Sequence, residues 1–422
     1  MTALDVYLHE DCAGRLERLD GARLRFTYDP DWLSAPRTPL SLSLPLREEP
    51  YADSDCRPFF AGLLPEGEFL KSIARTFHIS AENPFTVLRE IGGECAGAVS
   101  LVDQGAPPPF SFAPDPRWLS DLELVSLLER LPRHPLLTDT EGDEGIRLSL
   151  AGTRDKLGVL AENGRVGITR GHPPSTHILK VPPEKLSGLV ANEAYCMALA
   201  GETGLSVAQA TPVRADHLEA LLVERYDRFR TGSRVRRLHQ EDLCQAAGRP
   251  PEGKYESEGG PGVAECGALI RAHVAGPGAA LLSFLDALLF NLVIGNADAH
   301  SKNYSLLLEG DGAPTLAPLY DLISTRAYGH RFARKMGMKY GGEYRPDRIR
   351  GRHLDRLGDE LGIAHRRVRQ HAEAIAETVV RSRGAARDRL DDSWRQDPIL
   401  DSIDETIERF AEVLGNAATE PT

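Results

Sequence analysis

The chain has 422 residues, which is long enough for two or three domains with cores of their own. Hydrophobic residues make up 41% and charged residues 27%, values that are ordinary for a soluble globular protein. The net charge of −12 argues against indiscriminate nucleic-acid binding over the whole surface.

The cysteines and the first residues of the chain indicate the cellular compartment. Six scattered cysteines form no CxxC pair, which argues against a zinc site and a disulfide framework and fits a reducing cytoplasm. The start, MTALDVYLHEDC, lacks the basic and apolar stretches of a signal peptide. We therefore expect a cytoplasmic protein that does not associate with a membrane.

Residues 1–102 predict a mixed module. Alternating residues indicate strands at 5–8, 14–19 and 23–28, with Asp20-Gly21 as a turn. Residues 59–77 predict two helices broken at Pro65-Glu66-Gly67, and a further strand is expected at 97–102. The Pro-rich stretch 103–116 predicts a linker.

Residues 117–235 predict a nucleotide-binding lobe. A helix at 118–131 comes first, and a second helix is expected at 190–201. Apolar and alternating stretches indicate strands at 147–150, 157–162, 165–169, 177–181 and 220–224. From Ile146 onward, this pattern is that of a nucleotide-binding lobe.

Three segments of this lobe could contact a nucleotide. The turn Ala151-Gly152-Thr153-Arg154-Asp155-Lys156 has one Gly, so it matches neither a Walker A motif nor a kinase Gly-rich loop, but its backbone N–H groups could cradle phosphates. Lys180 either snorkels out of its apolar strand or reaches the phosphates, with Glu193 as a possible partner. Glu224, Arg225 and Tyr226 stand where a kinase hinge would face adenine, or form an ordinary strand end.

Residues 236–422 predict a helical lobe. The loop 248–262 is too polar for us to expect it to pack. Residues 281–295 are apolar at helical spacing with three polar interruptions, one of them Asn291, and are too short to span a bilayer, so a buried helix is expected. This helix delivers the chain to Gly295-Asn296 and a polar loop.

That polar loop carries the most informative pattern of the chain. Asp298 is followed five positions later by Asn303, and Asp321 comes after a predicted hairpin. This is the layout of a phosphotransferase site, where the first Asp accepts the proton of an attacking hydroxyl. The Asn and the second Asp would hold Mg²⁺ on the phosphates of ATP. His300 takes the place that small-molecule and lipid kinases give to His.

The same residues are also compatible with roles other than protein phosphorylation. Asp298, His300 and Asn303 could simply cap a turn, although their order, spacing and flanking elements favour catalysis. A small-molecule kinase could carry the same motif. A non-catalytic co-repressor would not need to retain Lys180 together with the motif. Basic residues also outnumber acidic ones from Leu322 to Arg389, and we expect either a solvated helix face or, at Arg366, Arg367 and Arg369, a phosphate-facing patch.

Taken together, the motifs resemble the HipA family of bacterial serine/threonine kinases, the toxin component of HipBA toxin–antitoxin modules. The resemblance is collinear over nearly the full length. It rests on FFAGLLPEG (59–67), SLAG (149–152), ILK (178–180), NEA (192–194), VERYDR (223–228), KYE (254–256), GGP (259–261), NADAHSKN (296–303) and YDL (320–322). One departure is Arg154, which stands where the family usually has Gln.

The resemblance implies an α+β, bilobal protein-kinase-like fold with an additional N-terminal subdomain. It implies a catalytic Asp298, Mg²⁺ ligands Asn303 and Asp321, and autophosphorylation at Ser149. It places ATP against a set of residues: Ala151–Lys156, Lys180, Glu224, Arg225, Tyr226, His300, Ser301, Lys302, Asn303, Tyr320 and Asp321. It also implies a HipB-like helix-turn-helix antitoxin that holds the protein on operator DNA. The substrate expected from the resemblance is an aminoacyl-tRNA synthetase, typically the glutamyl enzyme.

Overall fold

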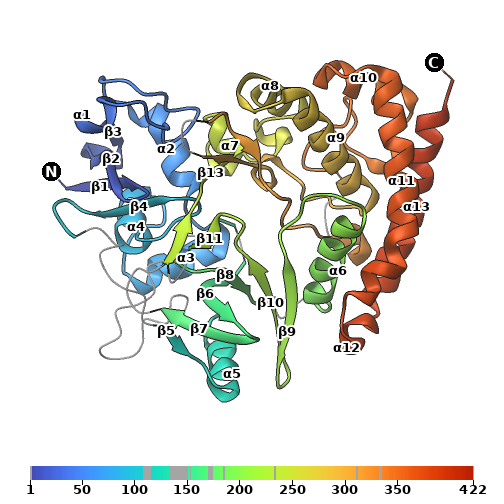
Figure 1. Cartoon of the computed structure of the whole chain (residues 1–422), viewed down its shortest axis with the longest axis horizontal. Coiled ribbons are helices and arrows are strands. Elements are labelled where there is room, and N and C mark those ends of the chain that lie inside the picture. Colours follow the sequence, from blue (N-terminus) through green and yellow to red (C-terminus); the bar gives the residue numbers. More distant parts are fainter. Residues whose placement is uncertain are drawn as a thin grey trace. The chain divides into compact units, whose positions relative to one another are not determined.

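The structure is a computed structural model that describes residues 2–107, 116–132, 151–152, 154–169, 174–183, 186–231, 234–309, 312–331 and 335–421. It divides into two compact units. The first comprises Met1–Lys185, Val213–Glu241 and Leu307–Gly312, and the second comprises Leu186–Pro212, Asp242–Leu306 and Ala313–Thr422. Figure 1 shows the elements in chain order.

The first unit begins with a four-stranded antiparallel sheet of order β3-β2-β1-β4. Its strands are β1 (Ala3–Leu8), β2 (Asp11–Arg18), β3 (Leu24–Tyr28) and β4 (Val99–Asp103). Alternate residues of β1, namely Leu4, Val6 and Leu8, are buried, which is the pattern of a strand with one face on a core. The strands expected in residues 1–102 are therefore confirmed.

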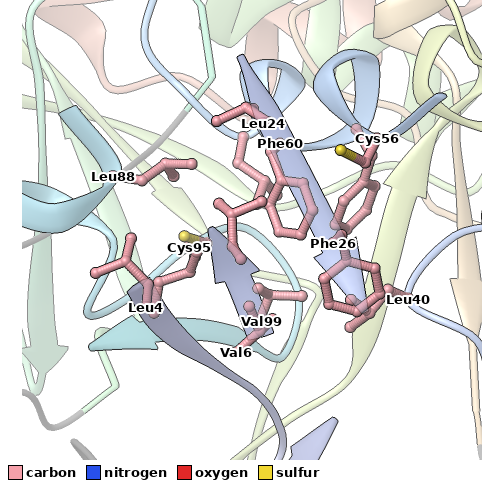
Figure 2. Packing of buried hydrophobic residues seen from close by; sticks show 14 of the residues in the cluster. Leu4, Val6, Leu24, Phe26, Leu40, Cys56, Phe60, Leu88, Cys95 and Val99 are labelled. Atoms are coloured by element: carbon pink, nitrogen blue, oxygen red, sulfur yellow. The ribbon is translucent and has the colours of Figure 1, made fainter. Parts of the chain in front are cut away.

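Helices cover this sheet and close its core. They are the short α1 (Pro30–Leu33), α2 (Asp53–Gly62), α3 (Gly67–Thr76) and α4 (Pro84–Ile91). Figure 2 shows Phe26 and Phe60 packed together among aliphatic side chains, with ring centroids 5.4 Å apart. The expected break between α2 and α3 is present, and Gly67 takes up the left-handed conformation there with φ of 61°.

A six-stranded sheet of order β5-β7-β6-β8-β10-β9 follows. Helix α5 (Asp121–Arg130) starts at a capping box formed by Ser120 and Glu123, and its Leu127 and Leu128 pack into the core of this sheet. The strands are β5 (Pro116–Trp118), β6 (Lys156–Glu162), β7 (Arg165–Thr169), β8 (His177–Lys180), β9 (Ala210–Ala215) and β10 (Leu218–Glu224). The strand expected at 147–150 lies outside the described residues.

A buried charge network joins distant parts of the first unit. Arg225 donates to Glu94 Oε1 at 2.9 Å and to both oxygens of Asp227, and Arg228 donates to Glu94 Oε1 at 3.0 Å. Gly97 N donates to Asp227 Oδ2 at 2.7 Å. Each of the four side chains is at most 8% exposed. The network thus fixes the end of β10 to residues 94–97 of the N-terminal module.

The charges of the network compensate for the loss of water around it. Burial alone would raise the pKa of Asp227, but the positive charges of Arg225 and Arg228 outweigh burial and hold that pKa well below its usual range. Burial lowers the pKa of the neighbouring Arg237 to about 10. Arg237 donates to Ser100 Oγ at 2.7 Å, so a neutral hydroxyl solvates this guanidinium in place of water.

Three short strands follow β10, namely β11 (Arg228–Thr231), β12 (Arg234–Arg237) and β13 (His239–Asp242). We expected the chain to turn helical from about residue 236. That expectation is wrong for β13, because this strand is short and polar, with no apolar alternation to reveal it. The fully buried His239 shares a hydrogen bond of 2.9 Å with Leu40 O through Nε2, and Glu241 accepts from Leu42 N at 2.8 Å.

The second unit is mainly helical. Its helices are α6 (Leu189–Glu202), the short α7 (Leu243–Ala246), α8 (Val263–His273), α9 (Pro277–Val293), α10 (Gly351–Leu361), α11 (His365–Asp388), the short α12 (Asp392–Arg395) and α13 (Ile399–Thr419). Helices α11 and α13 run side by side (Figure 1). Helix α6 packs against both and belongs to the second unit, although we expected it in the nucleotide-binding lobe. Its nearly all-round burial explains this placement.

Two further expectations for this unit need correction. The loop 248–262 does pack, because Pro251, Gly260 and Pro261 are buried. In the basic stretch, Arg366 and Arg367 are exposed, but Arg369 forms a two-point ion pair with Asp355 at 2.8 Å. The three arginines therefore do not form one phosphate-facing patch. Among the described residues, no helix is long and apolar enough to cross a membrane.

The buried charge network generates a stability prediction. Glu94→Gln leaves Arg225 and Arg228 buried with one carboxylate fewer, and it should lower the free energy of unfolding by about 3 kcal/mol. Urea unfolding measures this loss. Glu82→Gln is the matched control at an exposed position of the same module and should change stability by less than about 0.5 kcal/mol. Equal midpoints for the two variants would contradict the role assigned to the network.

A second prediction concerns pH. Burial lowers the pKa of His239 to about 4, below the value of about 6.5 expected in the unfolded chain. The unfolded chain therefore binds the proton first as the pH falls, and this histidine should cost about 2 kcal/mol of stability between pH 7 and pH 5. In His239→Gln, whose amide can still donate to Leu40 O, the pH dependence of unfolding should flatten by that amount. An unchanged pH dependence would show that His239 is not buried as a neutral ring.

Candidate active site

The loop that carries Asp298 begins at a glycine with a special conformation. Helix α9 ends at Val293, and Gly295 adopts a left-handed φ of 67°. A Cβ at Gly295 would lie 2.8 Å from side-chain atoms of Arg326 and Thr406, so no other residue fits without displacing them. The expected helix is thus confirmed, and its end directs the chain into the loop.

Two asparagine side chains hold this loop. Asn296 Nδ2 donates to Asn291 Oδ1 at 2.8 Å, and Asn296 Oδ1 accepts from Asp298 N at 3.2 Å. Asn291 is buried in α9. We did not predict either residue as part of the site, although a polar Asn291 within an apolar helix was the available signal, since a buried amide needs partners.

The same contacts bring Asp321 to the loop. Asn296 Nδ2 also donates to Asp321 O at 3.4 Å, and Thr325 Oγ1 accepts from Ala297 N at 2.8 Å. Asp321 has a left-handed φ of 53°, and such backbone conformations are uncommon for a residue with a side chain and cluster at functional sites. The spacing correctly predicted that the two motifs meet, although the hairpin's return strand β15 (Thr315–Leu316) is shorter than expected.

His300 lies buried in the loop as a neutral ring. Burial, and then the positive charges of Lys254 and Lys302, hold its pKa well below the usual range, while Asp321 acts in the opposite direction. Its backbone N donates to Asn303 Oδ1 at 3.2 Å, at the start of the 3-10 turn η6 (Ser301–Asn303).

The carboxylate of Asp298 belongs to an exposed residue of the loop. Tyr255, from the segment between α7 and α8, donates a hydrogen bond from its hydroxyl to Asp298 Oδ1. We did not predict Tyr255 as a site residue, because KYE (254–256) contributed only to the family resemblance and a tyrosine in a polar loop does not by itself indicate such a contact.

Three residues expected near the nucleotide brace the loop. Lys302 Nζ forms a buried ion pair with Asp242 Oδ2 at 3.0 Å, and Tyr320 donates to Lys302 O at 2.7 Å. Ser301 Oγ donates to Lys254 O at 3.1 Å. These bonds brace the loop, and the expected contacts of Ser301, Lys302 and Tyr320 with ATP stay a prediction.

In the first unit, two lysines are neighbours on adjacent strands of the six-stranded sheet. Lys156 of β6 and Lys180 of β8 are directly opposite in antiparallel register, and residues paired in this way point to the same face. Both are buried. Lys180 was expected to be the phosphate lysine, and the register adds Lys156 as its immediate neighbour.

Lys156 also shapes the expected phosphate turn. Its Nζ donates to Ala151 O at 2.5 Å, and a Cβ at Gly152 would lie 2.5 Å from that nitrogen. Gly152 has φ of 111°, which favours glycine. Burial raises the pKa of Asp155, and the charge of Lys156 partly offsets this. Thr153 of this turn and the expected autophosphorylation site Ser149 lie outside the described residues.

The side chains of the expected hinge residues form contacts within the first unit. Arg225 directs its guanidinium into the charge network, and its backbone N donates to Thr176 O at 3.0 Å. Tyr226 donates its hydroxyl to Gln240 Oε1. Glu224 is exposed and pairs in register with His177. The guanidinium of Arg225 is thus engaged within the first unit, and the expected contact of residues 224–226 with adenine stays a prediction.

The donors of the second unit fit Mg²⁺, and the lysines of the first unit fit phosphate, each taken by itself. Asn303 and Asp321 supply one amide and one carboxylate, the oxygen ligands that Mg²⁺ takes beside substrate phosphates. Within the described part of the chain, no group of three or more His, Cys, Asp or Glu side chains forms an all-protein metal cage. The lysine pair supplies positive charge that suits phosphate oxygens.

Comparisons with known proteins show which family the chain belongs to. Residues 4–102 match the HipA N-terminal domain, and residues 148–383 match the HipA-like C-terminal domain. The protein Y4mE of Sinorhizobium fredii, which is named as a kinase, is 41% identical over 90% of this chain and 91% of its own length. The serine/threonine-protein kinase toxin HipA of Shewanella oneidensis is 33% identical over 84% of this chain and 83% of its own.

A solved structure matches over nearly the whole length. HipA of Shewanella oneidensis MR-1, solved with HipB and its operator DNA, aligns with a TM-score of 0.82 at 28% identity and covers 98% of this chain and 99% of that one. The protein is thus a kinase with a mixed α+β fold. It belongs to the HipA family.

The lysine pair generates a kinetic prediction. Lys180→Ala removes one cation from the face shared with Lys156 and should raise the KM for ATP about tenfold or more, and Lys180→Arg should substitute poorly because its planar fork does not replace a compact ammonium. Initial rates measured against ATP concentration give the result. Lys71→Ala, at an exposed lysine of α3, is the control and should leave KM unchanged. An unaltered KM in Lys180→Ala would return Lys180 to a purely structural role.

Proposed function

We propose that the protein is an ATP-dependent serine/threonine protein kinase that acts as the toxin of a toxin–antitoxin module. The observation that carries the proposal is the loop 296–303, which presents the exposed Asp298 while asparagine bonds tie it to Asp321. An exposed carboxylate on a rigid loop beside a metal-type donor set is what phosphoryl transfer to a hydroxyl requires. The 33% identity to a protein named as a kinase toxin supports the biological role.

Each residue has a distinct task in this proposal. Asp298 accepts the proton of the attacking serine or threonine hydroxyl. Asn303 and Asp321 would hold Mg²⁺, which neutralises charge on the phosphates when bound. Lys156 and Lys180 attract phosphate oxygens from the face of the sheet that they share. His300, kept neutral by burial, presents a ring with no charge of its own to the nucleotide.

Substrate and partners are inferred from the family. The substrate would be a protein of translation, an aminoacyl-tRNA synthetase such as the glutamyl enzyme, and its modification would lead to growth arrest and persistence. A HipB-like helix-turn-helix antitoxin would bind the protein and make most of the contacts to operator DNA. The Shewanella relative, which was solved in complex with HipB and its operator DNA, supports an assembly of these three components. Autophosphorylation at Ser149 would inactivate the kinase, because a phosphate adds close to two negative charges beside the turn 151–156.

The decisive variant is Asp298→Asn. It should abolish phosphoryl transfer, because an amide cannot take the acceptor's proton, while ATP still binds. Asp321→Asn should in addition weaken Mg²⁺-ATP binding, because it removes a carboxylate ligand. Labelled ATP with purified protein and a cell lysate, followed by mass spectrometry, identifies both the modified substrate and any phosphate at Ser149.

Controls separate the competing functions. Asp392→Asn, at an exposed aspartate of α12, should transfer phosphate like the wild type. Label that appears only in small molecules would indicate a small-molecule kinase, and no label despite antitoxin binding would indicate a co-repressor. Autophosphorylation at the wild-type rate in Asp298→Asn would show that Asp298 is not the base.

A further inference from the structure

We propose that Tyr255 is a positioning residue for the catalytic base Asp298. Its hydroxyl donates to Asp298 Oδ1, and this bond would hold the carboxylate in one orientation toward the acceptor hydroxyl. This inference rests on the proposed function and adds to it the element that orients the base. A base held by a third group is a recurrent arrangement, because a rotating carboxylate aligns poorly with the proton that it must accept.

The backbone of the tyrosine segment is anchored on the catalytic loop. Ser301 Oγ, inside the turn η6, donates to Lys254 O at 3.1 Å. On the other side of Tyr255, Glu256 N donates to Gly337 O at 3.1 Å. A Cβ at Gly337 would lie 2.6 Å from Ala299 O, so the segment around Gly337 itself packs directly on the loop that carries Asp298. Tyr255 is thus fixed at both neighbouring positions.

Side-chain bonds reinforce the same anchor. Glu256 accepts from Lys339 N at 2.6 Å and forms an ion pair with Lys339 Nζ at 3.2 Å. Gly260 N donates to Tyr255 O at 2.9 Å, and a Cβ at Gly260 would overlap Gly253 O. The polar loop is therefore folded back tightly on itself, with no room for a side chain at that glycine.

The ring of Tyr255 is held as well. It meets the ring of the buried His300 edge to face, with centroids 5.0 Å apart and an interplanar angle of 84°. Lys254 Nζ lies 5.6 Å from the centroid of the tyrosine ring. A gate that must swing aside would need a free hinge, whereas Tyr255 is held by its ring and by its backbone. This is why we assign it to orientation of the base and not to blocking of the acceptor.

A blocking tyrosine and a positioning tyrosine predict opposite changes of the reaction rate when the hydroxyl of Tyr255 is removed. A blocking tyrosine would slow the enzyme and its removal would raise the rate. A positioning tyrosine keeps its own proton while the proton of the acceptor passes to Asp298, and its removal lowers the rate of the chemical step. Tyr255→Phe distinguishes the two because it removes the hydroxyl and retains the ring contact with His300.

In Tyr255→Phe we expect kcat to fall about tenfold, the size of a lost hydrogen bond to a charged group, with the KM for ATP unchanged. Tyr7→Phe is the matched control, a half-buried tyrosine of β1 in the first unit, and its kcat should equal that of the wild type. An equal kcat in Tyr255→Phe, or a raised one, would overturn the proposal. A wild type that transfers no phosphate to any acceptor would instead reject the proposed function.

A second measurement needs no activity. Thermal unfolding of Tyr255→Phe, Asp298→Ala and the double variant forms a cycle that isolates the contact between the two side chains. We expect the shift in Tm of the double variant to be smaller than the sum of the two single shifts. Additive shifts would show that the hydroxyl and the carboxylate do not interact, and would overturn the proposal even where kcat falls.

Discussion

The first unit depends on four buried charges that cannot be separated. Glu94 and Asp227 balance Arg225 and Arg228, and none of these groups could remain ionised there alone, since removing an ion from water costs several kcal/mol. The positions of all four side chains are therefore fixed by one another. Because three of the charges belong to the segment after β10 and one to the N-terminal module, the network holds the end of a sheet strand against a separate layer of the fold.

The second unit achieves comparable order with neutral groups. Asn291 and Asn296 pass hydrogen bonds from the end of a buried helix to the loop of Asp298 and on to the backbone of Asp321. An amide offers a donor and an acceptor at once, so a single side chain can connect two backbone segments without bringing charge into the core. These amides order the start of the loop, while the buried ion pair of Lys302 with Asp242 braces its end and Asp298 keeps its carboxylate exposed.

Local patterns in the sequence predicted the strands and helices whose residues alternate or repeat with a regular period. Alternation located the strands of the first module, and the apolar period located α9 and hence the motif that begins at its end. Contacts between distant residues were beyond such reasoning. The register that opposes Lys156 to Lys180 depends on strand order, and the ion pair of Arg369 with Asp355 depends on how α10 and α11 pack. Tyr255 was missed because a polar loop normally signals exposure, whereas here glycines and backbone bonds fold it onto the site.

The buried network also has a consequence for biosynthesis. Glu94 and Arg225 are 131 positions apart, and a ribosome adds roughly 5 to 20 residues each second. For about ten seconds, the nascent N-terminal module therefore carries a carboxylate whose partners have not yet been made. It must stay hydrated until Arg225 and Arg228 emerge, so the last step in closing this module waits for a strand that belongs to the next sheet. Completion of the first layer of the fold is thus set by the order of translation as well as by its own hydrophobic core.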